Sequence, residues 1–209
     1  VYTGYAVSSE WEAINELEIG GRNLLLDSTG DYKTFYVPSF YSTLPNGYKK
    51  NLSDYGLSVG DTITYRLFID GTYSGNGALA RISAYKDDDT YYSVIGNMVG
   101  DGVKNYSTII YTIPSDVIAI AFGIQNKSAG SGSPTYNIQY KEDKLEKGNK
   151  PTDWTPAPED VQAEIDSAKQ EALTAAGNAQ TSANTANTAI GNLNTYVDGS
   201  FKDGVIEAS

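Results

Sequence analysis

The chain has 209 residues, a formal net charge of −11 and a pI near 4.4, and it contains neither cysteine nor histidine. Nucleic acids and anionic membrane surfaces bind clustered Lys and Arg, so this charge balance argues against both as partners. Without His or Cys there is no Ser-His-Asp triad, no Cys-His pair and no ordinary zinc site, which excludes most hydrolase chemistry. No apolar run approaches the ~20 residues of a bilayer span, and no signal peptide is expected at Val1.

Residues 1–19 are expected to be a linker or the end of a preceding module. Residues 1–7 read like the last strand of such a module. Ser9 and Glu12 have the spacing of a capping box, which predicts a short helix over residues 10–18. The alternative is an extended linker, in which Trp11 has no assigned role.

Residues 20–158 show the alternation of β-strands between turns rich in Gly, Asp and Ser. The predicted strands are residues 23–27, 33–42, 62–69, 80–86, 91–95, 106–113, 117–125 and 136–144. Pro38 interrupts the second of these and indicates an edge strand or a bend. About eight short strands predict an antiparallel β-sandwich. Two strand faces are expected to form its core. One consists of Ile63, Tyr65, Leu67 and Ile69, and the other of Ile118, Ile120, Phe122 and Ile124.

The composition changes after Pro151, Pro156 and Pro158, which favour an extended exit from the sandwich. Residues 159–209 are predicted as a helical coiled-coil stalk and the start of the next module. Glu159 or Asp160 suits the N-terminus of this helix. Small and apolar residues then recur at steps of four and three, as in a coiled-coil seam, at positions 161, 165, 168, 172, 175 and 179 and again at 183, 186, 190, 193 and 197. A helix folded back on the sandwich is the alternative.

Three motifs lie near the two ends of the predicted sandwich: GRNLLLDS at 21–28, KLEKG at 144–148 and TDWTPAPED at 152–160. They resemble the carbohydrate-binding-module-like jelly rolls of tail and baseplate proteins in phages of Gram-positive bacteria. The segment YVDGSFKDGVIEAS at 196–209 also resembles the segment that follows such modules in long tail proteins. The resemblance implies a jelly-roll β-sandwich, a place in the virion after assembly in the bacterial cytoplasm, and adhesion to host cell-wall saccharide.

The polar faces of the long strands are the best candidate for a binding surface. If the strands that carry them pack in one sheet, Arg66, Arg81, Tyr85, Gln125 and Gln139 share a face, and the small residues 119, 121 and 123 leave a shallow trough. Guanidinium and amide groups hydrogen-bond sugar hydroxyls, and a Tyr ring packs on the C–H face of a sugar. The alternative is that a solvent-facing sheet is polar in any case, and that the 17 tyrosines reflect strand preference.

Two further features have a functional and a structural interpretation. The run Asp87, Asp88 and Asp89 lacks the spacing of a known calcium loop and favours a solvated hairpin turn, whereas Glu142 and Asp143 are weak candidates for a structural calcium ion. Trp154 lies between two prolines of the exit motif, which favours a structural plug at the base of the sandwich over a sugar-stacking role.

Three functions remain compatible with these features. The first is a non-catalytic saccharide-binding module of a phage tail protein, and the second is a structural spacer on a trimeric stalk with no ligand. The third is a polysaccharide-degrading enzyme, disfavoured because no motif places two carboxylates across a cleft. The expected partners are host cell-wall saccharide, other tail or baseplate proteins, and two further copies that form a homotrimer through the C-terminal helix. No cofactor is expected beyond the possible calcium.

Overall fold

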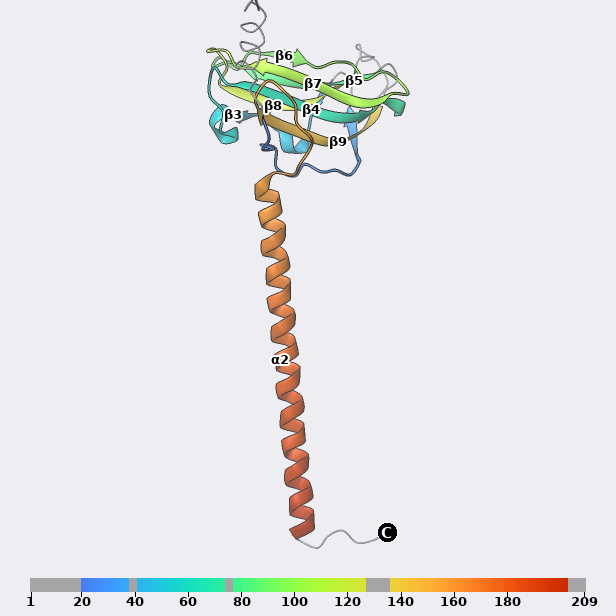
Figure 1. The fold of residues 1–209 in the computed structure, drawn as a ribbon, viewed down its shortest axis with the longest axis vertical. Helices are drawn as coiled ribbons and strands as arrows, with labels where there is room; N and C mark the ends of the chain where they lie inside the picture. The colour runs from blue at the N-terminus through green and yellow to red at the C-terminus, as the bar shows by residue number, and fades with distance from the viewer. Residues whose placement is uncertain (1–19, 38–40, 74–76, 127–135, 203–209) are drawn as a thin grey trace, which may run out of the picture. The chain divides into compact units, whose positions relative to one another are not determined.

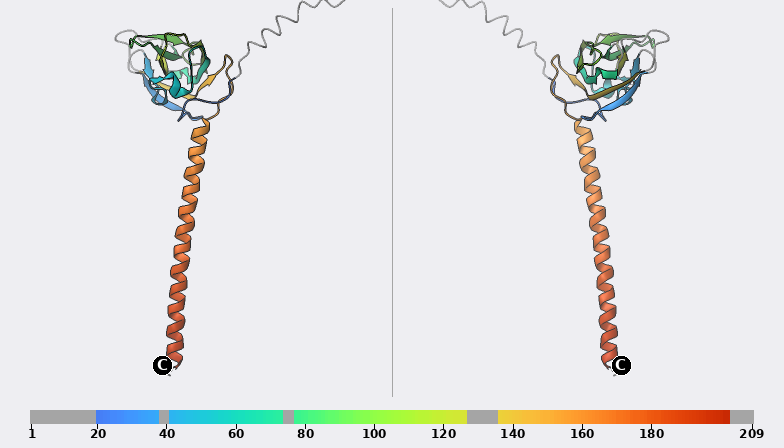
Figure 2. Two further views of the ribbon diagram at one scale, coloured as in Figure 1. Left: turned by 90° about the vertical axis from the view of Figure 1, so that its left-hand side faces the viewer. Right: turned by 90° about the vertical axis from the view of Figure 1, so that its right-hand side faces the viewer.

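The computed structural model describes residues 20–37, 41–73, 77–126 and 136–202. The strand and helix expected within residues 1–19 lie outside the described residues. The chain divides into two compact units, residues 1–161 and residues 162–209. The first unit contains the sheets, and the second contains most of one long helix (Figures 1 and 2).

Two antiparallel sheets make up the first unit (Figure 1). The four-stranded sheet has the order β1 (Lys33–Val37), β9 (Tyr136–Lys147), β4 (Thr62–Asp70) and β7 (Lys104–Thr112). The five-stranded sheet has the order β2 (Tyr41–Thr43), β8 (Ala119–Asn126), β5 (Ala78–Tyr85) and β6 (Tyr91–Ile95), and the short β3 (Lys50–Asn51) also pairs with β8. Short 3-10 turns lie at η1 (Pro45–Gly47), η2 (Leu52–Tyr55) and η3 (Gly71–Tyr73).

The core lies between the two sheets, as the alternation in the sequence predicted. Tyr65 of β4 and Phe122 of β8 are fully buried, and their ring centroids are 4.8 Å apart. The other apolar residues of the same β4 face are fully buried as well, and both sheets contribute to one hydrophobic cluster. This arrangement confirms a mainly β, two-sheet fold and is consistent with a β-sandwich.

Three strand predictions need correction. Residues 33–42 are not one strand, because β1 pairs with β9 and β2 pairs with β8 in the other sheet. Residues 23–27 form no strand, since only Leu24 among them donates a backbone hydrogen bond to β9, and Asp27 has a positive φ of 57°. Ile118 precedes β8 and is exposed, while its neighbour Val117 fills the core instead.

The base of the first unit is fastened by the motifs at the two ends of the sandwich. The Asn23 side chain donates hydrogen bonds to the carbonyls of Asp143 and Thr155, both at 3.2 Å, and accepts from the backbone N–H groups of Leu25 and Leu145. The Trp154 indole donates to Ser28 Oγ at 2.7 Å. These contacts give Trp154 a structural role at the base, in line with the plug that the sequence favoured.

A buried ion pair completes this junction. Lys144 and Glu146 are both almost fully buried in β9, with Nζ and Oε2 3.4 Å apart. Lys144 Nζ also donates to Thr152 Oγ1 at 2.6 Å and to the Asp153 carbonyl at 2.7 Å, while the Thr152 N–H donates to Glu146 Oε1 at 2.8 Å. Because buried charges require partners, the KLEKG and TDWTPAPED motifs are explained here by architecture.

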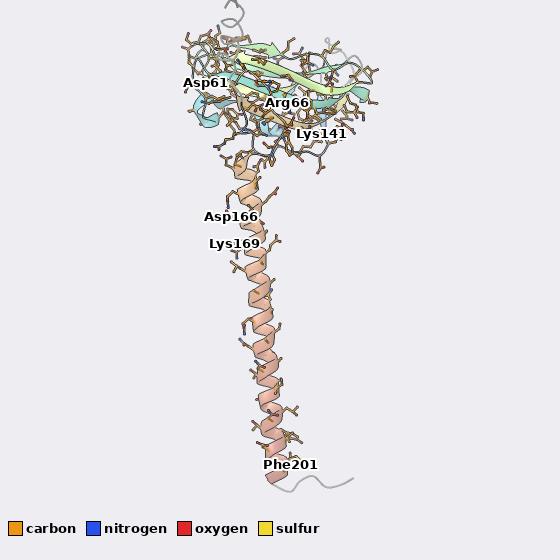
Figure 3. All side chains as sticks on the ribbon, in the orientation of Figure 1. Asp61, Arg66, Lys141, Asp166, Lys169 and Phe201 are labelled. Atoms are coloured by element: carbon orange, nitrogen blue, oxygen red, sulfur yellow. The ribbon has the colours of Figure 1, made fainter. Side chains whose placement is uncertain are left out.

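The helix α2 spans Pro158–Lys202 and continues through Gly177 and Gly191 without a break (Figure 2). Its first turn carries Glu159 and Asp160, as expected for a helix N-terminus. Side chains along it, including Asp166, Lys169 and Phe201, project away from the helix axis (Figure 3). None of the helices in the described part of the chain combines the length and apolarity needed to cross a membrane.

Candidate functional site

The polar face of the five-stranded sheet is built by strict alternation along β5. Ala80, Ile82 and Ala84 point into the core, so Arg81, Ser83 and Tyr85 lie on the opposite face. The register places six residues of the neighbouring strands beside these three: Ile95, Ser93 and Tyr91 on β6, and Gly123, Ala121 and Ala119 on β8.

Arg81 is the centre of this face. Its Nη1 donates to Gln125 Oε1 at 3.1 Å, and its Nε donates to Ser83 Oγ at 3.4 Å. The guanidinium carbon lies 6.0 Å from the centroid of the Tyr91 ring. Arg81 is only 3% exposed and Gln125 only 7%. The two planar groups are therefore fixed by one another and set below the surface.

An aromatic pair borders the Arg81 group. The rings of Tyr85 and Tyr91 have centroids 5.2 Å apart and an interplanar angle of 40°. Lys49 Nζ lies 4.5 Å from the centroid of Tyr85 and forms an ion pair with Asp89 at 2.6 Å. Tyr91 is 44% exposed, which makes it an accessible aromatic group of this face. We call Lys49, Arg81, Tyr85, Tyr91 and Gln125 the Arg81 cluster.

The predicted trough has a different form from the one expected. The small residues Ala119 and Ala121 are almost completely buried. The floor is therefore not open to solvent in this conformation. A ligand on this face would meet Tyr91 and Tyr85 first, and the Arg81–Gln125 pair behind them.

Arg66 and Gln139 do not belong to this face, so the prediction that all five candidates share one sheet is wrong. Arg66 lies on β4 and Gln139 on β9, both in the four-stranded sheet. The Arg66 guanidinium carbon is 4.3 Å from the centroid of Tyr106, and little of its side chain reaches solvent. Figure 3 labels Arg66 together with Lys141 of the neighbouring strand β9.

Tyr91 and Lys49 are members of the cluster that sequence reasoning missed. Tyr91 carries a local signal, because it is the direct partner of Tyr85 across the hairpin turn at residues 87–89. Lys49 carries none, because it reaches Tyr85 from a segment distant in the sequence.

The two calcium candidates, Glu142 and Asp143, lie in different surroundings. Glu142 lies at a bulge of β9, where Lys141 Nζ is 2.6 Å away and the Tyr106 hydroxyl donates a hydrogen bond. Burial pushes the pKa of Glu142 up, but the bonds from Lys141 and Tyr106 hold it below its usual value. Asp143 is fully buried. Burial raises the pKa of Tyr140 above its ordinary value, and the Asp143 carboxylate raises it further. No group of three or more acidic side chains suited to a metal ion occurs within the described residues.

The run at residues 87–89 forms the turn of the β5–β6 hairpin, as the sequence favoured. Asp88 accepts from the Thr90 backbone N–H at 2.9 Å, and Asp89 pairs with Lys49. Asp88 is thus occupied by the turn itself, and Asp89 is occupied by Lys49.

No protein-family model and no curated protein sequence matches the chain. Solved structures to which the chain is similar over part of its length include the CBM22-1–GH10 modules of endo-1,4-beta-D-xylanase 10B from Clostridium thermocellum with xylohexaose (TM-score 0.41, 13% identity, covering 68% of this chain and 30% of that chain). They also include the tripod from the baseplate of bacteriophage Tuc2009, with a TM-score of 0.45 and 14% identity, covering 68% of this chain and 60% of that chain. A third is a family 16 carbohydrate-binding module, with a TM-score of 0.28 and 16% identity, covering 62% of this chain and 98% of that chain. The chain thus spans less than two thirds of the length of the first two of these structures.

Proposed function

We propose that this chain is a non-catalytic saccharide-binding module of a phage tail protein, which attaches to host cell-wall polysaccharide through the Arg81 cluster. The observation that carries the proposal is the pairing of Arg81 with Gln125 beside the stacked Tyr85 and Tyr91. An aromatic face for sugar C–H groups next to planar hydrogen-bonding groups is the combination that saccharide recognition requires.

The fixed geometry of the cluster favours binding. Arg81 and Gln125 are held by each other and by the sheet, so little side-chain entropy is lost when a ligand binds. Tyr91 supplies an exposed ring on the edge strand β6. The strand order of the two sheets supports a jelly roll, and the terminal motifs of the chain support a place in a phage tail.

The proposed oligomer forms through the α2 helix. Ile165, Leu173, Ile190, Leu193 and Phe201 are all more than half exposed, which is unfavourable for an isolated helix in water. Residues 172–197 contain no charged side chain, so charge does not oppose close packing of identical helices. We propose a homotrimeric coiled coil, in which three weak saccharide sites gain affinity through effective concentration.

A structural spacer is the second candidate function, and one observation favours it. Arg81 and Gln125 are nearly inaccessible, and a purely structural sheet surface would also pair its polar groups in this way. Incubating the fluorescently labelled 209-residue protein with a panel of Gram-positive cell walls distinguishes the two. Retention on at least one wall supports the module, and absence from every wall supports the spacer. Shortening of the polysaccharide would instead indicate an enzyme.

A further inference from the structure

A second concave site lies within the first unit, built from elements that the Arg81 cluster does not use. Its volume is about 420 Å³, within the range of roughly 300–1,000 Å³ typical of small-molecule sites. The N-terminal arm (residues 20–28), β3 with η2, the end of β9 and the first turn of α2 each contribute to it. The residues that matter for its chemistry are Arg22, Leu24, Lys50, Tyr55, Lys147 and Glu159. We call it the basal cleft.

Three cations converge on the basal cleft of a chain whose net charge is −11. Arg22 and Lys147 are already engaged, with Glu159 and with Asp61 respectively. Lys50 is different, since within the described residues it has no carboxylate within 4.0 Å, and its Nζ lies 5.2 Å from the Tyr55 ring centroid. The cleft therefore has an ammonium group that makes no ion pair with a carboxylate of the described residues.

The acidic groups of the cleft do not cancel this charge. The Asp54 carboxylate accepts from the Asn51 backbone N–H at 3.1 Å, where it caps η2. Glu159 is committed to Arg22. A ligand anion would thus meet Lys50 directly and Arg22 and Lys147 as longer-range cations.

Tyr55 and Leu24 contribute apolar surface to the cleft, and both are held in place by hydrogen bonds. Tyr55 is buried, and its hydroxyl is used by a 3.0 Å bond to the Tyr48 carbonyl. Leu24 is half-buried beside it and is held by its backbone bond to Leu145. A ring with C–H groups on one side and an anionic substituent toward Lys50 fits this combination.

We propose that the basal cleft binds an anionic sugar, in which a carboxylate or phosphate group pairs with Lys50 and the ring lies against Tyr55 and Leu24. This site is independent of the proposed function. Lys49 and Lys50 are consecutive, but Lys49 lies over Tyr85 of the Arg81 cluster and Lys50 over Tyr55 of the basal cleft. Each lysine thus serves as the control for the other.

The test titrates the isotopically labelled 209-residue protein with sodium glucuronate, glucose 6-phosphate and uncharged glucose, and follows backbone amide shifts. We expect saturable shifts at Leu24, Asp54 and Gly56 with one or both anionic sugars and none with glucose. The two anionic probes distinguish carboxylate from phosphate. Lys50→Gln should weaken this binding about tenfold, as expected for the loss of one charge-assisted contact.

The matched variant Lys49→Gln should leave the shifts at the basal cleft unchanged. Lys49 and Lys50 are both exposed, so both variants should melt like the parent protein. The proposal is overturned if neither anionic sugar gives saturable shifts at these amides, if glucose acts equally well, or if Lys50→Gln and Lys49→Gln behave alike. If the Arg81 cluster proved not to bind cell walls, these expected results at the basal cleft would be unchanged, so the two proposals can fail separately.

Discussion

Arg81 Nη1 donates to Gln125 Oε1 across 3.1 Å, joining β5 to β8 on the polar face of the five-stranded sheet. The pair is a fixed element of the sheet and not a flexible surface contact, because both side chains are nearly inaccessible. The contribution of this pair to stability can therefore be measured separately from its contribution to binding.

Replacing Arg81 by Ala should destabilise the sandwich by about 1–3 kcal/mol, because Gln125 loses its donor in a buried position. The sequence placed Arg81 on the solvent-facing side of a strand, and its burial in the structure corrects that expectation. The measurement is urea unfolding of the parent protein and the variant. Lys33→Ala, at an exposed position in β1, is the control and should shift the midpoint little. An unchanged midpoint for Arg81→Ala would contradict the buried pair.

Replacing Asn23 by Ala should cost about 3 kcal/mol, since its side chain makes four hydrogen bonds at a fully buried position. The loss should appear as a lower melting temperature of the sandwich. Asn137→Ala, an exposed amide in β9, is the matched control and should melt like the parent protein. Equal melting temperatures for the two variants would show that Asn23 does not fasten the base.

Acid should destabilise the sandwich through carboxylates that hold ion pairs. The hydrogen bond from Lys147 lowers the pKa of Asp61, and Lys104 lowers that of Asp70 despite the opposing effect of burial. A lowered folded-state pKa gives stability that is present above about pH 4, the ordinary Asp value, and is lost as pH falls through the folded pKa. Melting curves between pH 6 and about pH 2 test this. Asp61→Asn should flatten the pH dependence, and an unchanged profile would contradict it.

The alternation along β4 and β8 was predictable from the sequence because burial of one face imposes a period of two on the side chains. Which strands share a sheet was not, since pairing joins residues far apart in the sequence. Arg66 and Arg81 look equivalent as sequence, yet they lie in different sheets. Lys144 and Glu146 read as surface charges, and only the packing of Thr152 against them reveals a buried ion pair.

The oligomer prediction depends on α2 alone. In sedimentation equilibrium, the 209-residue protein should form a trimer and a fragment of residues 20–161 should be a monomer. The fragment keeps Arg22–Glu159 and the bond from Asp27 to Asp160, so it should unfold cooperatively. Because Ala at most seam positions buries little area, the trimer should dissociate on dilution. An antiparallel dimer, or a fragment that aggregates, would contradict this account.

The most direct test of the saccharide-binding function compares the parent protein with Tyr91→Ala in binding to purified wall polysaccharide. Tyr91 is the exposed ring of the Arg81 cluster, and Tyr36, exposed in β1 of the other sheet, is its control. Loss of a stacked ring costs about 0.5–1.5 kcal/mol, so binding should fall several-fold in Tyr91→Ala. The melting temperature should fall only slightly, through the lost contact with Tyr85. Tyr36→Ala should bind like the parent protein. Equal binding by both variants, or no binding by the parent protein, would contradict the account.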